Sequence, residues 1–205
     1  MPLVATRSNA PASAYGFTSG AAPEVLGGMV LMTPTSIVST GTGNSSSISA
    51  NGSVTFSSCA TLSLNGVFTS SYDNYMMVMR SNTSTTSNYQ VRLRVGGTDN
   101  STASSYTYQY IQASSTTVVA GRTTTNFGYI NAGANTRRDG TTVYFYGPNL
   151  AQPTAFRSVT MYDANSAVIF DMANTHNQST AYDGFTLFTD IGTATGLVTV
   201  YGLGG

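Results

Sequence analysis

The sequence predicts an all-β protein: an antiparallel, jelly-roll-like β-sandwich with an extended N-terminal arm. Thr, Val and Tyr are common, whereas Lys is absent and Glu occurs once, so residue propensity favours strands over helices. From residue 54 onward, apolar and polar residues alternate with a period of two, as expected for strands with one buried face. Turn-forming sequences separate these stretches at short intervals, which is typical of sandwiches and jelly rolls.

The composition indicates an ordered domain with an uncharged surface. Ser, Thr and Asn supply 73 of the 205 residues, only 8% of residues are charged, and the formal net charge is zero. The 13 Tyr and 9 Phe provide enough aromatic area for a core. A neutral surface argues against nucleic-acid binding, which depends on basic patches. No apolar run approaches the about 20 residues of a membrane span, so membrane insertion is not expected either.

Residues 1–35 predict an N-terminal anchoring arm. This segment holds four of the six prolines and shows no sustained periodicity, so regular structure is interrupted repeatedly. Tyr15, Phe17, Val25 and Leu26 supply apolar points that need burial. We therefore expect the arm to pack against another subunit or a larger assembly; a loose terminus is the alternative.

A linker is predicted for residues 36–53, which are rich in Ser, Gly and Asn, and a sandwich domain for residues 54–205. Turn sequences such as Asp139-Gly140 and Asp183-Gly184 separate the strands of this domain. The expected strands are Val54–Phe56, Thr61–Val67, Asn74–Arg80, Asn88–Val95, Tyr106–Ala113, Phe127–Asn131, Thr141–Tyr146, Phe156–Asp163, Ala167–Ala173, Phe185–Phe188 and Leu197–Tyr201.

Two neighbouring strands carry the candidate binding or interface residues. Arg92 and Arg94 alternate with apolar residues in one strand, and Tyr106, Tyr108 and Tyr110 share one face of the next. If the two strands pair in register, the arginines face the tyrosines in a cross-strand ladder, whereas a slip of one residue buries the tyrosines. Arg and aromatic residues are enriched at interfaces, and Tyr also stacks on sugars. The ladder thus fits a subunit interface or a glycan site; the alternative is an outer sheet surface without a binding function.

Signs of catalysis are missing from the sequence. No hydrolase, metalloprotease or nucleotide-binding motif occurs, and the single histidine, His176, lies in a polar stretch predicted to be a loop. Most Asp residues stand in turn contexts, where their side chains cap the backbone. We expect no enzyme activity, no catalytic residue, no cofactor and no metal. Cys59 is predicted to be a small buried residue, and Met76, Met77 and Met79 to fill the core or a subunit contact.

The stretch from Val54 to Tyr201 resembles a family of β-rich virion proteins of tailed bacteriophages. The resemblance is carried by "VTFSSCATLSLNGVFTSSYDNYMMVMR", "LRVGGTDNSTASSYTYQY", and "GFTLF" followed by "TGLVTVYG". It implies a jelly-roll-like sandwich, often trimeric, in a tail fibre, minor tail protein or capsid-surface component. The arm with "SAYGF" is similar to virion-anchoring starts in some of these proteins. No functional motif of the family transfers residue by residue.

Together these observations predict a non-enzymatic virion structural protein, assembled in the host cytoplasm. We expect a homotrimeric tail-fibre or tail-tip component that contacts other virion proteins through its arm. A capsid decoration or cement protein on the head exterior is the first alternative. A carbohydrate-binding adhesin that recognises a host-surface glycan is another, and a polysaccharide-degrading enzyme is a third.

Overall fold

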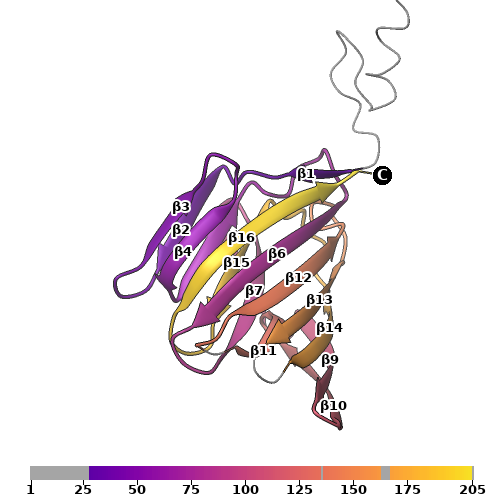
Figure 1. Cartoon of the computed structure of the whole chain (residues 1–205). Coiled ribbons are helices and arrows are strands. Elements are labelled where there is room, and N and C mark those ends of the chain that lie inside the picture. Colours follow the sequence, from indigo (N-terminus) through magenta and orange to yellow (C-terminus); the bar gives the residue numbers. More distant parts are fainter. Residues whose placement is uncertain (1–27, 135, 163–166, 205) are drawn as a thin grey trace, which may run out of the picture.

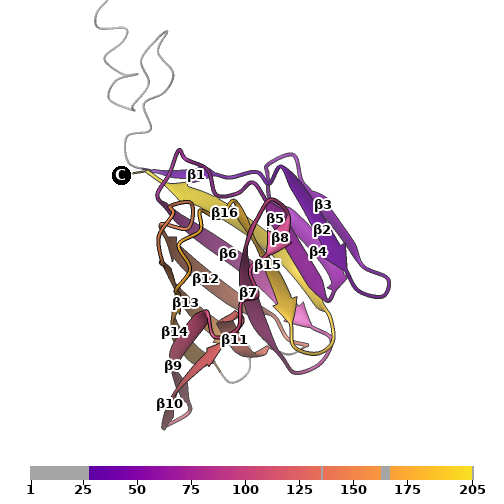
Figure 2. The same cartoon turned by 180° about the vertical axis from the view of Figure 1, so that it is seen from behind.

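The computed structural model describes residues 28–134, 136–162 and 167–204 of the chain. Within these residues the regular elements are all strands, and no helix occurs. Sixteen strands form two antiparallel sheets, one of ten strands and one of six. The ten-stranded sheet faces the viewer in Figure 1, and the six-stranded sheet faces the viewer in Figure 2, where the molecule is turned by 180°. The predicted antiparallel sandwich is therefore confirmed.

The ten-stranded sheet runs from one edge to the other through nine strands, and a short tenth strand pairs with the end of one of them. These nine are, in spatial order, β10 (Thr117–Thr125), β9 (Tyr106–Ser114), β14 (Val168–His176), β13 (Thr154–Tyr162), β12 (Asp139–Tyr146), β6 (Asn74–Thr83), β16 (Ala194–Leu203), β4 (Val54–Cys59) and β3 (Ser45–Ile48); β1 (Met29–Leu31) pairs with β16.

The six-stranded sheet is narrower and covers only part of its partner. Its strands are, in order, β11 (Gly128–Ala134), β7 (Ser87–Val95), β15 (Gly184–Thr189), β5 (Thr61–Asn65) and β2 (Ser36–Thr40), with β8 (Thr98–Asp99) paired to the end of β7. Because this sheet ends at β11, the β9–β10 hairpin projects past it, as both views show.

The core lies between the two sheets and is largely aromatic. Phe68, in the loop before β6, has its ring centroid 4.8 Å from Tyr75, 5.2 Å from Phe145 and 5.7 Å from Phe185. Since Tyr75 and Phe145 belong to one sheet and Phe185 to the other, this cluster joins the two layers. Aromatic pairs at such distances are worth about 0.5–1.5 kcal/mol beyond their burial. Cys59 is buried, as predicted.

The eleven predicted strands each overlap an observed strand, and two of them, β13 and β14, pair antiparallel. The predicted linker at residues 36–53 is wrong. It contains β2 and β3, which lie at the ends of the two sheets, and Ser39 and Ser46 join them through a 2.9 Å hydroxyl hydrogen bond. Edge strands are held by backbone hydrogen bonds, so a run of Ser and Thr can form them without apolar alternation.

The described part of the predicted arm packs against the sandwich. β1 pairs with β16, and Pro34 is buried. The backbone N–H of Gly204 donates to the carbonyl of Gly28 over 2.9 Å, so both ends of the described domain lie together. The predicted anchoring residues Tyr15, Phe17, Val25 and Leu26 lie outside the described residues.

Candidate functional site

The predicted arginine–tyrosine ladder does not form. Its two strands, β7 and β9, belong to different sheets: β7 pairs with β11, β15 and β8, whereas β9 pairs with β10 and β14. The loop after β7 makes a tight hairpin with β8 instead, through two glycines, Gly96 and Gly97, with φ of 57° and 78°. Positive φ at both central residues is typical of a type I′ turn. The Gly96-Gly97 turn therefore favours pairing of β7 with β8 over pairing of β7 with β9.

Arg92 and Arg94 have structural partners on the outer side of the six-stranded sheet. The guanidinium carbon of Arg92 lies 4.8 Å from the ring centroid of Phe188, and its Nε donates to the carbonyl of Asn126 over 3.1 Å. Arg94 is buried, donates to the Thr186 hydroxyl over 2.8 Å and lies 3.5 Å from a carboxylate oxygen of Asp99. Both arginines therefore connect β7 to neighbouring loops and strands of the six-stranded sheet.

The three tyrosines point to the inner side of the ten-stranded sheet. Tyr106 is fully buried, and burial raises the pKa of its hydroxyl. Tyr108 stacks on Tyr129 with centroids 4.9 Å apart, and Tyr110 lies 5.8 Å from Phe170. Tyr106 is therefore covered, whereas Tyr108 and Tyr110 are half-buried beside these aromatic partners. Because the arginines belong to the other sheet, no arginine–tyrosine ladder exists to form a glycan platform or a subunit contact.

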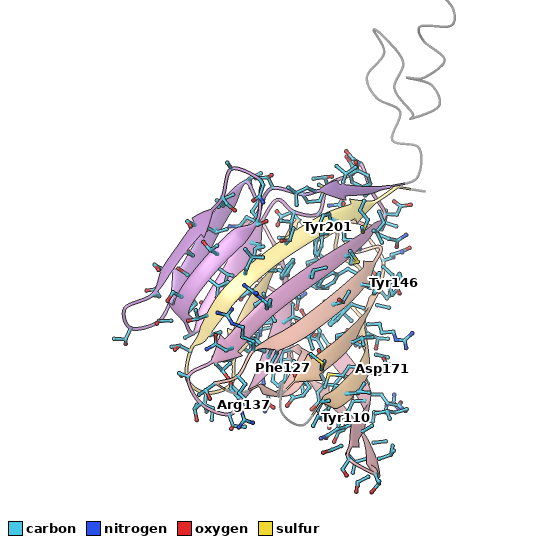
Figure 3. The ribbon with its side chains drawn as sticks, in the orientation of Figure 1. Tyr110, Phe127, Arg137, Tyr146, Asp171 and Tyr201 are labelled. Atoms are coloured by element: carbon cyan, nitrogen blue, oxygen red, sulfur yellow. The ribbon has the colours of Figure 1, made fainter. Side chains whose placement is uncertain are left out.

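A different surface carries the unusual chemistry: the solvent-facing side of the ten-stranded sheet, here called the outer sheet face. The strand register places its side chains in rows that cross the sheet. In one row Ile169 stands opposite Met161, and in the next Asp171 stands opposite Val159. Figure 3 looks onto this side. The large apolar side chains exposed here are Met29, Val78, Ile111, Val118, Tyr146, Val159, Met161, Ile169 and Leu197, from 37% exposed at Leu197 to 68% at Val118.

The outer side of the other sheet has the opposite character. There the hydroxyls of Thr40 and Thr61 lie 2.7 Å apart, and those of Ser63 and Thr186 lie 2.8 Å apart. The Ser63–Thr186 pair is buried and the Thr40–Thr61 pair is exposed, and Val38 is an exposed aliphatic side chain beside them. Because the two outer surfaces of one sandwich differ so much, the apolar one is not a by-product of composition.

An ion pair lies in the middle of the outer sheet face. The Nε of Arg157 donates to Asp171 over 2.8 Å, and a second guanidinium nitrogen bonds the other carboxylate oxygen. The hydrogen bond from Arg157 lowers the pKa of Asp171, so the pair stays ionised at neutral pH. Arg80 and Arg122 also lie on this face. Two of the charges on the face thus neutralise each other, which reduces the cost of covering it.

Sequence reasoning identified only one part of this surface. The methionine group of β6 was predicted to fill the core or a subunit contact; Met77 and Met79 are in the core, whereas Met76 lies on the outer sheet face. The sequence feature that could have revealed the outer sheet face is the presence of apolar residues at both odd and even positions of one strand, as in "YMMVM", "SVTMY" and "AVIF". Such strands are typical of sheets covered on both sides.

His176 is a core residue, so its predicted loop position is wrong. It ends β14, is fully buried, and its ring stacks on Tyr106 with centroids 4.1 Å apart. Among the described residues no group of three or more His, Cys, Asp or Glu side chains is placed to hold a metal ion. Over the same residues, no helix has the length and apolar character to cross a membrane.

One hollow of about 660 Å³ lies at the end of the outer sheet face nearest residues 28 and 204. It is lined by Tyr72, Asp73, Asn74 and Tyr146, together with Ser71, Leu203 and Gly204. The ring of Tyr146 is 46% exposed. Exposed tyrosine beside Asp and Asn provides a stacking surface with hydrogen-bonding groups at its margin.

The comparisons with known proteins identify no family. No family model matches the chain, and no curated protein sequence matches it. Among solved structures, the crystal structure of the botulinum neurotoxin serotype G binding domain is similar over 87% of this chain, with 6% identity and a TM-score of 0.23. The chain spans 44% of the length of that structure.

Proposed function

We propose that the chain is a non-enzymatic structural protein of a tailed-bacteriophage virion, and that it forms a homotrimer through its outer sheet face as part of a tail fibre or tail tip. The virion setting and the number of subunits rest on the sequence resemblance between Val54 and Tyr201. The observation that carries the assembly is the apolar character of the outer sheet face, on a chain whose other outer surface is polar.

The free energy available from covering this face is large enough to matter. At roughly 25 cal/mol per Å², burying about 400 Å² of apolar surface contributes about 10 kcal/mol before the cost of association. The strands of the face form one hydrogen-bonded sheet, so the surface is rigid and little conformational entropy is lost when it is covered. A second and third copy of the same chain provide partners with the same apolar character.

The positions of residues 28 and 204 support a tethered module. Because these residues are hydrogen-bonded to each other, the segments before and after the domain connect at the same end of the sandwich. A domain attached at one end leaves its opposite end free. This arrangement suits a protein that is anchored to other virion proteins through residues 1–27.

A pair of matched valine variants tests the assembly. Val78 lies on the outer sheet face and is 39% exposed, and Val38 lies on the other outer surface and is 54% exposed. Val78→Asp should convert trimers to smaller species in sedimentation equilibrium, because it places a charge in the covered region; Val38→Asp should leave the trimer intact. A wild-type protein that is monomeric at all concentrations contradicts the proposal.

The capsid version of the proposal differs only in location. A decoration or cement protein would bind the head exterior through the same sandwich and arm. Electron cryo-microscopy of the particle separates the two, since density on the capsid symmetry axes supports the head and density along the tail supports the fibre.

Glycan binding at the hollow beside Tyr146 is a second candidate function, favoured by its exposed ring and its Asp73 and Asn74 neighbours. Binding to host-surface glycans on an array should be lost in Tyr146→Ala and kept in Tyr144→Ala, which removes a half-buried ring of the same strand outside the hollow. Equal binding by both variants contradicts this site.

A further inference from the structure

The free edges of the two sheets are protected against strand pairing, with one exception. Edge strands display unpaired N–H and C=O groups and invite another strand, so they are usually short, bulged, charged or covered. β3 has four residues and is joined to β2, β1 has three, and β8 has two. β11 is longer but contains two register shifts against β7. Each of these edges is a poor template for a partner.

β10 lacks such protection. It pairs with β9 over nine consecutive residues without a register shift, contains no proline, and holds one charged residue, Arg122. Seven of its nine residues are exposed. β9 is the single described strand that pairs with it, so its other edge faces no described strand. Together these features make β10 a long and regular edge.

We propose that β10 is a strand-addition edge whose partner is β10 of a second copy of this chain, paired antiparallel about a twofold axis at Gly121. This interface is distinct from the outer sheet face and does not depend on the proposed virion function. Centring the pair on Gly121 aligns all nine residues of each strand. It also places Arg122 opposite Ala120 of the second copy, so the two Arg122 side chains are diagonal neighbours on one face and not directly opposite each other.

The side chains of β10 are complementary to themselves in this register. Val119 stands opposite Thr123 of the second copy, and Val118 stands opposite Thr124, so β-branched residues meet on both faces of the strand pair. Cross-strand pairs of β-branched residues are favourable in sheets. No foreign partner is needed to satisfy this edge.

Gly121 has local support from Tyr110. A Cβ added at Gly121 would lie 2.7 Å from the Tyr110 ring, so the ring covers the glycine closely. An aromatic ring over a cross-strand glycine compensates for its missing side chain. The position that a twofold axis would cross is therefore regular in spite of its glycine.

The twofold pairing also continues the apolar surface. Val118 and Ile169 lie in one row of the outer sheet face, two strands apart. A twofold axis perpendicular to the sheet keeps the outer sheet faces of both copies on the same side. Edge pairing therefore links two subunits without hiding the surface through which each is proposed to trimerise.

Charge variants test both the pairing and its register. Val119 and Thr123 are exposed, and each lies opposite the other across the proposed axis. Val119→Lys with Thr123→Lys places like charges opposite each other and should raise the dissociation constant of the edge dimer about tenfold or more. Val119→Glu with Thr123→Lys pairs opposite charges and should restore association. Thr85→Lys with Thr86→Lys, in the exposed β6–β7 loop, adds the same charge as a control.

Combining these variants with Val78→Asp separates this interface from the proposed trimer. Native mass spectrometry of Val78→Asp should show dimers, which become monomers when the two β10 lysines are added. A monomeric Val78→Asp protein overturns the β10 pairing even if the wild type is trimeric. Dimers that persist in Val119→Lys with Thr123→Lys, or that are not restored by the Glu–Lys variant, overturn it as well.

Discussion

The hydroxyl of Tyr182 lies 2.6 Å from Nε2 of His176, inside the core. On the other side of the ring, Nδ1 of His176 lies 3.2 Å from the carbonyl oxygen of Ser105. A carbonyl can only accept, so Nδ1 carries the proton and Nε2 accepts from Tyr182. The amide of Asn100 in turn donates to the Tyr182 hydroxyl over 2.8 Å. This series of hydrogen bonds fits a neutral imidazole, in which Nε2 accepts a hydrogen bond, and it does not fit an imidazolium, in which both ring nitrogens donate.

The first prediction concerns acid stability. Burial lowers the pKa of His176 to about 4 in the folded protein, while the unfolded chain takes up its proton near the ordinary value of 6.5. Stability is therefore full above pH 6.5 and is lost as the pH falls toward 4. The loss should reach about 3 kcal/mol in the free energy of unfolding. Denaturant titrations of the wild type and of His176→Gln, which cannot titrate, measure the difference.

NMR provides a direct check of the same prediction. The chain has one histidine, so its imidazole resonances are unambiguous. Their midpoint in the folded protein should lie near pH 4. A midpoint near pH 6.5, or identical pH profiles of stability for the wild type and His176→Gln, contradicts the buried neutral histidine.

The second prediction separates two of the tyrosines. The Tyr106 hydroxyl accepts from the backbone N–H of Leu93 and donates to the carbonyl of Asn100, both over 3.0 Å. Tyr106→Phe leaves both backbone groups without this partner and should cost about 1–3 kcal/mol of stability. Tyr108→Phe keeps the stack on Tyr129 and should change stability by less than about 0.5 kcal/mol. Equal thermal shifts for the two variants would contradict these roles.

The third prediction concerns a close approach between strands of the six-stranded sheet. A Cβ at Gly184 would lie 2.1 Å from the backbone carbonyl oxygen of Leu64, whereas a Cβ at Gly140 would meet no atom within 4 Å. Gly184→Ala must push β15 away from β5 and should cost about 1–3 kcal/mol. Gly140→Ala should be neutral. Chemical denaturation measures both, and a neutral Gly184→Ala would show that the two strands separate easily.

The fourth prediction concerns the ion pair of the outer sheet face and rests on the proposed assembly. Asp171→Asn leaves the charge of Arg157 without its partner in a covered surface, so the dissociation constant of the oligomer should rise about tenfold. Removing both charges with Arg157→Gln and Asp171→Asn should weaken association less than the single change. Because the pair is exposed in the isolated subunit, monomer stability should change little in either variant. A single variant that associates like the wild type contradicts a covered position.

Much of the fold could be predicted because most strands bury one face. In β6, for example, Tyr75, Met77 and Met79 alternate with more exposed residues, and the predicted strand lies within the observed one. β10 could not be found in this way. It is exposed on both faces, so its side chains carry no alternation, and backbone pairing with β9 defines it. β2 and β3 escaped prediction because the residues of their inner side are only half-buried and are mostly Ser and Thr apart from Ile37 and Ile48.

The sequence by itself determined the class of the fold, the positions of the strands with a buried face, and the lack of any recognisable catalytic motif. These follow from local preferences and from which side chains avoid water. The tertiary structure alone decided which strands are neighbours. Strands that lie close together in the chain can enter different sheets, as β7 and β9 do, because the free energy of pairing comes from contacts between distant segments. That choice placed Tyr106 in the core, kept Arg92 from the tyrosines, and assembled the outer sheet face from the ten strands of one sheet.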